Sequence, residues 1–296
     1  MCLTKDGLDI DSLWERKRQM VEEAKGLSVW RGGERFADIG GLENLKLHMS
    51  RLLNGRRKPR VIVFIDEIEK AMAGASGGDL SGVSEGMLGT LLTKMQDTNA
   101  MGVILIGPAG SGKSVIAKAT GNEGGIPTVY FDLKGMEGSL VGESGAALRA
   151  ALKVVDAVGQ GDSLYLATCN KIAALPPELR RRFGEGTFFV DLPSAEEREA
   201  IWRIYLKKYQ VKDGKRPDDE GWTGAEIFRC VYQAWNLNVP LAESAKFIVP
   251  ISRSAADQIE QLRQQASNRY ISASHSGVYR YDKTITAAPQ RRIGLE

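Results

Sequence analysis

Residues 107–114 read Gly107-Pro108-Ala109-Gly110-Ser111-Gly112-Lys113-Ser114, and the expected fold class follows from them. They match G-x-x-x-x-G-K-[ST], a loop whose glycines let backbone N–H groups turn inward around phosphate oxygens. An apolar run at 102–106 precedes the loop and a helix-forming run at 115–120 follows it, as the motif requires. Residues 107–115, with Val115 as the last, are therefore predicted to bind nucleotide phosphates. A chance glycine-rich turn is the alternative, and both flanks argue against it.

Two carboxylates follow a second apolar run. Residues 61–65 fit a buried strand, and Asp66 and Glu67 stand at its carboxyl end. We predict that Asp66 and Ser114 hold Mg²⁺ and that Glu67 deprotonates the attacking water. Lys113 is predicted to reach the β- and γ-phosphates. A solvated acidic turn is the alternative for the pair, but beside a phosphate loop the two carboxylates supply the other half of one site.

Two later segments carry further candidates. An apolar strand at 165–168 leads to Asn170, which is predicted to hydrogen-bond the γ-phosphate or the water; a turn-capping Asn is the alternative. Three consecutive arginines at 180–182 suggest an arginine finger given to a neighbouring subunit, because guanidinium groups stabilise charge on a transferring phosphate. A basic end of a surface helix is the alternative for this run.

Short apolar runs alternate with helical segments between Phe36 and Pro193. This pattern predicts an α/β fold, a parallel sheet with helices on both faces. The expected strands are 61–65, 103–106, 128–131, 163–167 and 187–190. After Pro193 the strands stop, and helices are expected at 195–209, 224–235 and 255–267.

The distribution of these expected helices and strands predicts four regions. They are an N-terminal helical extension (1–35), a nucleotide-binding domain (36–193), a helical lid (194–250) and a C-terminal helix with a polar tail (251–296). The extension contains an amphipathic helix at 10–25 and a glycine-rich loop at 26–35. The tail is expected to be disordered from about Ile271.

The composition sets outer limits on function. The 296 residues are 43% apolar and 26% charged, with a net charge of +3, which is too mild to indicate nucleic-acid binding. No run spans a bilayer and the start lacks the apolar core of a signal peptide, so no membrane contact is expected. The cysteines Cys2, Cys169 and Cys230 form neither metal-ligand spacing nor a disulfide framework, which favours a cytoplasmic location.

With these residues together, the chain resembles the AAA clade of the AAA+ ATPases from about Phe36 to Val249. Residues 36–42 are similar to the segment that opens that module, residues 141–144 to the stretch after its first pore loop, and residues 224–227 to the start of its lid helix. Residues 191–198 and 257–263 look like those of the small AAA ATPases encoded by a conserved reading frame of cyanobacteria and algal chloroplasts.

The resemblance implies a P-loop AAA+ fold whose five strands lie in the order 5-1-4-3-2, counted in the family's own sequence order. It implies that ATP and Mg²⁺ bind, that ATP is converted to ADP and phosphate, and that copies assemble into a ring, a hexamer, which remodels a protein partner. Asp38, Ile39 and Gly40 would contact adenine through their backbone, and Ala225 would face the nucleotide. In the family's Gly-Arg-Phe pattern, which carries the arginine finger, the arginine corresponds best to Arg182 here and second best to Arg181.

The chain also departs from the family. Leu140 stands where many unfoldases carry an aromatic residue, which puts strong gripping of a threaded polypeptide in doubt. The Gly-Arg-Phe pattern of the family's arginine finger is shortened in this chain. Ala225 stands where some AAA+ clades carry an arginine, which agrees with the AAA clade proper.

The order of the motifs is inverted. In the family the phosphate loop precedes the acid pair, whereas Asp66 and Glu67 precede Lys113 here, so the block 61–101 stands exchanged with the block 102–161. We interpret this as a rearranged or engineered sequence. Each block is made of whole strand–helix units, and right-handed crossovers would keep each helix on its family face. We therefore expect the sheet order and the site to survive, with connections that reach about 5 Å further.

Two other functions fit the same motifs. A nucleic-acid loader or helicase would need a basic stripe, and the sequence offers only short basic runs. A nucleotide-binding scaffold would result if the rearrangement had abolished turnover.

Overall fold

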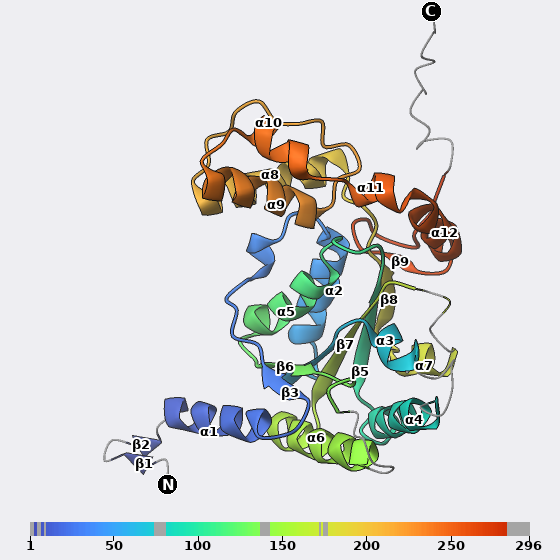
Figure 1. Ribbon diagram of the computed structural model, residues 1–296. Helices are drawn as coiled ribbons and strands as arrows, with labels where there is room; N and C mark the ends of the chain where they lie inside the picture. Colours follow the sequence, from blue (N-terminus) through green and yellow to red (C-terminus); the bar gives the residue numbers. More distant parts are fainter. Residues whose placement is uncertain are drawn as a thin grey trace, which may run out of the picture.

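The phosphate-loop strand β5 (Met101–Ile106) and the acid-pair strand β4 (Val61–Ile65) lie in one sheet with β7 (Ser163–Cys169) between them. In this computed structural model the full order is β3-β6-β4-β7-β5-β8-β9 (Figure 1). Neighbours from β6 to β9 are parallel, and β3 pairs antiparallel with β6. The other four strands of this sheet are β3 (Leu27–Val29), β6 (Thr128–Phe131), β8 (Gly186–Phe189) and β9 (Ile271–Ser272).

The structure describes residues 3–4, 7–8, 10–73, 81–136, 143–171, 173 and 177–282. A separate two-stranded antiparallel sheet, β1 (Leu3–Thr4) and β2 (Gly7–Leu8), stands at the N-terminal end of this range. Among the helices of the described ranges, none combines the length and apolarity needed to cross a membrane.

Both faces of the sheet are buried, as a parallel sheet requires. Successive side chains of a strand point to opposite faces, and β4 shows this directly. Its residues 61, 63 and 65 belong to one apolar cluster, and residues 62 and 64 belong to another. All five are buried, so the continuous apolar run follows from two cores rather than one.

Helices cover each face (Figure 1). The cluster on one face includes residues of α1 (Ile10–Glu22), α3 (Ile68–Ala73), α4 (Ser81–Asp97), α6 (Glu143–Gly159), α7 (Pro177–Arg182) and α12 (Ala256–Ala266). The cluster on the other face includes residues of η1 (Phe36–Asp38), α2 (Glu43–Leu53) and α5 (Lys113–Gly124).

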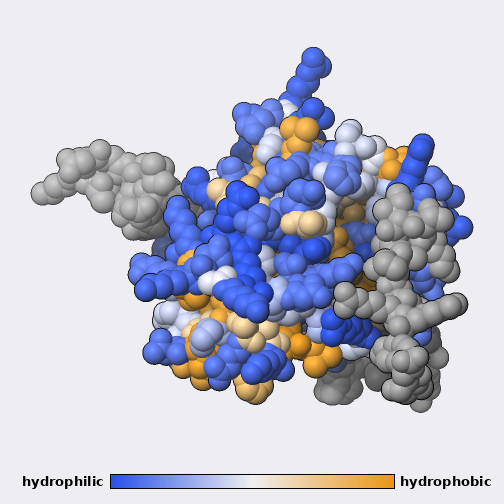
Figure 2. All heavy atoms as spheres, turned by 90° about the horizontal axis from the view of Figure 1, so that it is seen from above, coloured by the Kyte–Doolittle hydropathy of each residue, from blue (hydrophilic) through white to orange (hydrophobic). Residues whose placement is uncertain are grey.

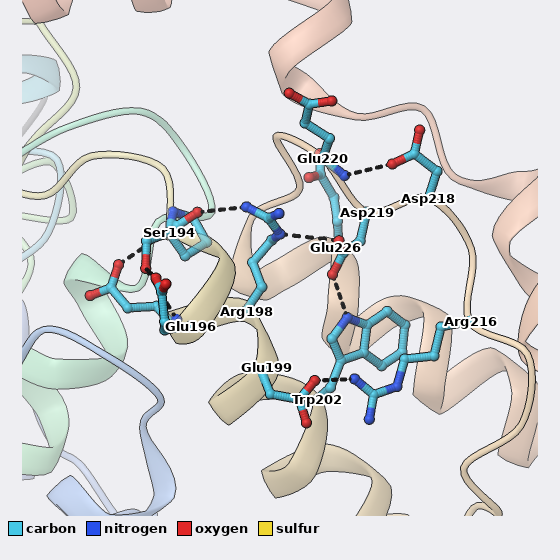
Figure 3. Close-up of polar contacts among 12 residues, drawn as sticks. Ser194, Glu196, Arg198, Glu199, Trp202, Arg216, Asp218, Asp219, Glu220 and Glu226 are labelled. Carbon is cyan, nitrogen blue, oxygen red and sulfur yellow. Dashed lines mark hydrogen bonds and ion pairs between the residues drawn. The ribbon is translucent and has the colours of Figure 1, made fainter. Parts of the chain in front are cut away.

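A small helical unit stands above the carboxyl edge of the sheet (Figure 1). Its apolar cluster is its own, with Trp202, Trp222 and Ile227 among the buried residues. Trp202 donates its indole N–H to Asp219, which also pairs with Arg198 (Figure 3). The elements of the unit are α8 (Ala195–Tyr209), α9 (Gly224–Leu237), α10 (Leu241–Ser244) and η4 (Ala245–Phe247); α11 (Ile251–Ser254) leads from it to α12.

The five expected strands lie side by side, in the order that the resemblance implied, but the sheet has seven strands. The glycine-rich segment 26–35 contains β3, whose three residues pair with β6. The polar segment after Ile271 was expected to be disordered, and this was wrong for residues 271–282. Residues 271–272 form β9 beside β8, and Ala273 N–H donates to the Phe189 carbonyl at 3.0 Å. Both strands are too short to show an alternating pattern, so the sequence did not reveal them.

Asp191 fastens the returning C-terminal segment to the end of β8. Arg263 of α12 donates through Nε to its carboxylate at 2.8 and 3.1 Å. The Tyr279 hydroxyl donates to the same carboxylate at 2.6 Å. Asp191 lies between β8 and α8, so the bonds join α12 to the connection that leads into the helical unit.

Residues 60, 101 and 161, which bound the segments 61–101 and 102–161, lie near one another at the amino edge of the sheet. Val61 of β4 pairs with Ser163 of β7, and Met101 of β5 pairs with Leu164 of β7. Arg57 binds this region together, because its guanidinium donates to Asp162 at 3.0 Å and to the carbonyls of Thr98, Asn99 and Gly161. The ends at 60, 101 and 161 therefore lie within about two strand spacings, about 10 Å, of one another.

This adjacency predicts that the block order can be changed without changing the fold. A chain reassembled as 1–60, 102–161, 61–101 and 162–296 should form the same sheet and unfold within about 5 °C of the original. Circular dichroism and thermal unfolding measure this outcome. A control that exchanges blocks cut inside α4 and α6, at the buried Leu91 and Leu152, should not fold. A reassembled chain without a cooperative transition would contradict the prediction.

Candidate functional site

The loop between β5 and α5 is shaped by close backbone approach. A Cβ at Gly107 would lie 2.0 Å from the Val190 carbonyl oxygen, so only glycine fits beside the end of β8. Gly112 has φ of 98°, a left-handed conformation that glycine adopts without strain, and it precedes the first residue of α5. Among the described residues, nothing accepts a hydrogen bond from the backbone N–H groups of residues 109–112. These N–H groups at a helix N-terminus are suited to an anion.

Lys113 is buried within this loop. Only 5% of it is exposed, and its Nζ donates to the Gly107 carbonyl at 2.9 Å and to the Pro108 carbonyl at 2.7 Å. Burial lowers the pKa of Lys113 to about 8, and the negative charge of nearby Glu69 opposes this shift. The Ser111 hydroxyl is buried without a hydrogen-bond partner in the described part of the chain. The loop therefore holds a cation and an unused polar atom where phosphate is expected.

Ser114 and Asp66 are in contact although 48 positions separate them in the chain. The Ser114 hydroxyl donates to Asp66 Oδ1 at 2.8 Å. The Thr168 hydroxyl, from the end of β7, donates to the same oxygen at 2.6 Å. A hydroxyl and a carboxylate in contact are hard oxygen ligands of the kind that Mg²⁺ prefers.

Glu67 follows Asp66 in an unusual backbone conformation. Its φ of 49° lies in the left-handed region, which costs a residue with a side chain about 1–2 kcal/mol. Its N–H donates to the Thr168 hydroxyl at 2.8 Å, and its carboxylate Oε1 accepts from Asn170 Nδ2 at 3.0 Å. Lys70 forms an exposed ion pair with its other oxygen. The predicted base and the predicted sensor are thus joined directly.

A third carboxylate, Glu69, completes the acidic side of the site. It is 7% exposed, and its Oε1 accepts from the Asn170 backbone N–H at 2.9 Å. Its Oε2 is buried without a hydrogen-bond partner among the described residues. Sequence reasoning missed both Glu69 and Thr168. Glu69 lies in the first turn of α3 and Thr168 near the end of β7, and their contacts join segments about a hundred residues apart, which the sequence alone did not reveal.

The segment predicted to contact adenine lies against the loop and the helical unit. Asp38 Oδ2 accepts from the Arg35 backbone N–H at 2.9 Å, and Ile39 is buried. A Cβ at Gly40 would lie 2.6 Å from Ile201 of α8, so the segment packs closely on that helix. On the other side of the loop, Ala225 N–H points at the Gly110 carbonyl at 3.4 Å.

Arg181 and Arg182 lie at the opposite edge of the sheet. Together with Arg51, Arg56 and Met101 they line a cavity of about 480 Å³. Met101 is the first residue of β5, whereas Lys113 comes after the loop that follows its last residue, Ile106, so the length of the strand, about 17 Å, separates the arginines from the phosphate loop. The structure therefore gathers Asp66, Glu67, Asn170 and the loop into one site and leaves both arginines outside it.

The predicted pore-loop position Leu140 lies outside the described residues, as do Val141 and Gly142. The structure therefore leaves the expectation about polypeptide gripping as a prediction.

The residues at this site fit a magnesium-bound nucleoside triphosphate. Phosphate oxygens would satisfy the free N–H groups of 109–112 and the orphaned Ser111 hydroxyl. Lys113 would exchange its two carbonyl partners for phosphate oxygens, which are stronger charge-assisted acceptors. Ser114 and Asp66 would hold the metal, and Glu67 lies beside them as a carboxylate able to accept a proton.

Parts of this chain are similar in sequence to known AAA proteins. Residues 103–160 match the family described as ATPase family associated with various cellular activities (AAA). The chain is 25% identical over 315 aligned positions to the AAA domain-containing protein ycf46 of Guillardia theta, a match covering 87% of this chain and 56% of that protein. It is 26% identical to the protein of the same name from Trieres chinensis, covering 92% of this chain and 60% of the relative. Cell division control protein 48 homolog C of Arabidopsis thaliana is 25% identical, covering 78% of this chain and 29% of that protein.

These similarities support the predicted resemblance to AAA+ ATPases and, with it, ATP binding. The chain spans little more than half the length of the two ycf46 relatives, 56% and 60%. The activity, substrates and partners of the whole protein are for this reason matters of proposal.

Burial of Lys113 predicts a pH dependence of nucleotide affinity. Phosphate binding favours the protonated amine, and its pKa in the free protein is about 8. Affinity for ATP should therefore be constant below pH 8 and fall by up to about tenfold for each pH unit above it, with proton uptake on binding. Calorimetric titration from pH 7 to 9.5 measures both effects. Lys113→Met should bind weakly at every pH, and an unchanged wild-type affinity at pH 9.5 would contradict the prediction.

Proposed function

We propose that this chain hydrolyses ATP to ADP and phosphate with Mg²⁺ as cofactor. The observation that carries the proposal is the 2.8 Å hydrogen bond between Ser114 Oγ and Asp66 Oδ1. It joins the two halves of a magnesium nucleotide site that stand in inverted order along the chain. A chance glycine-rich turn and an unrelated acidic turn would have no reason to meet there.

Each residue then has a defined role. The N–H groups of 109–112 and Lys113 bind the phosphates, and Ser114 and Asp66 hold the metal, which when bound neutralises phosphate charge. Glu67 accepts the proton of the attacking water, because no other carboxylate of the site combines partial exposure with an orienting amide. Asn170 holds the Glu67 carboxylate and is placed to report the γ-phosphate through it. Asp38, Ile39, Gly40 and Ala225 are proposed to border the adenosine.

We propose that Arg182, with Arg181, acts on the nucleotide of a neighbouring copy. In the described part of the chain no carboxylate forms an ion pair with Arg51, Arg56, Arg181 or Arg182, and all four line the cavity at the amino edge. At the nucleotide site on the other edge, Lys113 is the one cation that we assign to the phosphates, and Lys70 is paired with Glu67. Two different complementary surfaces on one chain favour head-to-tail association, which closes into a ring; a hexamer is our proposal for its size.

A protein partner suits the surface better than a nucleic acid. The helical unit exposes large apolar side chains, among them Trp235, Leu237, Phe247 and Val249, and Figure 2 shows hydrophobic residues between hydrophilic ones on the face seen from above. Exposed apolar groups of this kind are typical of protein contacts. The net charge of +3 gives little electrostatic attraction for nucleic acid. We therefore propose remodelling of a protein partner, in the cytoplasm.

We also infer that two segments are exchanged relative to the family order. The family match covers residues 103–160, and the second of the two exchanged blocks inferred from the sequence is 102–161. A match that stops within one residue of both junctions is expected if the neighbouring segments stand out of order.

Removing the base should abolish turnover and keep binding. Glu67→Gln should lower the ATPase rate about 10²–10⁴-fold, because the amide cannot accept a proton, while ATP affinity changes less than about threefold. Phosphate release and titration with a fluorescent ATP analogue measure these outcomes. Glu243→Gln, an exposed carboxylate on α10, is the matched control. Equal phosphate release by Glu67→Gln and the unaltered protein would remove the claim of catalysis.

The neighbouring-copy role of Arg182 can be tested by mixing inactive variants. Arg182→Ala should lower the rate about 10³-fold, yet an equal mixture with Glu67→Gln should recover about a quarter of the normal rate, because a quarter of random interfaces carry both intact residues. Arg180→Ala is the control, since Arg180 bonds Tyr270 of its own chain at 3.2 Å and should stay active alone. No recovery on mixing, with oligomers formed, would refute transfer between copies.

A further inference from the structure

The Thr168 hydroxyl forms hydrogen bonds to both members of the acid pair. Thr168 lies at the end of β7, is 1% exposed, and its hydroxyl is 2.6 Å from Asp66 Oδ1 and 2.8 Å from the Glu67 backbone nitrogen. Thr168 has no role in binding the nucleotide, because its side chain is too deeply buried to reach a phosphate. We propose that Thr168 is the positioning residue that fixes the metal-holding carboxylate and the base in one arrangement.

The direction of the two hydrogen bonds follows from the groups involved. A hydroxyl has one proton and two lone pairs. The Glu67 N–H can only donate, and an ionised Asp66 can only accept, so the Thr168 proton goes to Asp66 and a lone pair receives the Glu67 N–H. Both bonds therefore depend on the same oxygen and are lost together when it is removed.

The backbone at the end of β4 shows why this oxygen is needed. The pairing of β4 with β7 ends at Ile65 and Ala167, so the next N–H groups of β4 have no strand partner. The Thr168 hydroxyl replaces the missing acceptor for Glu67. Glu67 holds a left-handed φ of 49°, which persists only where the surroundings stabilise it.

That left-handed turn decides where the base points. It directs the Glu67 carboxylate to Asn170 Nδ2 at 3.0 Å. The Asp66 carboxylate accepts a hydrogen bond from the Ser114 hydroxyl. Without the Thr168 bonds, Glu67 would relax toward an ordinary conformation and its carboxylate would leave Asn170. Asp66 would keep only the Ser114 hydroxyl, and its hold on the metal would loosen.

Four residues at position 168 separate the hydroxyl from the methyl group. Thr carries both groups, Val keeps the methyl shape without the hydroxyl, Ser keeps the hydroxyl alone, and Ala has neither. If the hydroxyl positions the acid pair, Thr and Ser should hydrolyse ATP similarly, within about threefold, while Thr168→Val and Thr168→Ala lose about 10–100-fold in kcat. The ATP affinity of all four should agree within about threefold, and the Val and Ala variants should need more Mg²⁺ for half-maximal rate.

A role in packing alone reverses the ranking. A buried methyl group matters most for packing, so Thr and Val would then be alike and Ser and Ala would be impaired in stability and rate. That result, or a Thr168→Val enzyme with unchanged kcat and Mg²⁺ requirement, overturns the inference. If Thr168→Val does not fold, the Ser and Ala pair decides, because these two differ only in the hydroxyl.

The inference rests on the proposed ATPase function, and the same measurements tell the two failures apart. An unaltered protein that binds no ATP and releases no phosphate refutes the ATPase and the role of Thr168 with it. An active unaltered protein with an equally active Thr168→Val refutes the role of Thr168 alone.

Discussion

The hydrogen bond from Ser114 to Asp66 is the constraint on which the rest of the structure depends. It forms because the carboxyl ends of β5 and β4 reach the same edge of the sheet, where β7 lies between them. The parallel pairing of β4 and β5 with β7 provides that placement, and the apolar clusters on both faces of the sheet hold it. A site assembled across three strands is rigid because moving one strand would open the cores on both faces.

Chain order is a weaker constraint than strand adjacency in this molecule. The sheet has the strand neighbours that the family resemblance implied, with Asp66 and Glu67 before Lys113 in the chain. The reason is local, because the strand ends concerned lie beside one another and Arg57 caps the turns that join them. A fold is thus specified by which strands pack beside one another, and loops of different order along the chain can connect the same strand arrangement.

The sequence predicted the elements whose physics is local. Glycine spacing indicates the phosphate loop, and uninterrupted apolar runs indicate the strands and the acid pair that follows one of them. It did not predict β3 or β9, which form because a sheet edge offers unpaired groups, nor the roles of Thr168 and Glu69. Those roles arise from contacts across about a hundred residues of chain, for which a single sequence carries no direct signal. The location of Arg181 and Arg182 at the far edge likewise became visible only in three dimensions.

The return of the chain to the sheet has a mechanical consequence. The helical unit leaves the sheet after Asp191 and comes back through α11 to α12, which Arg263 and Tyr279 tie to that same Asp191. A body fastened by two adjacent straps can swing about the line through them but cannot twist or slide freely. We infer that a movement of Ala225 relative to Gly110 would turn about these two connections.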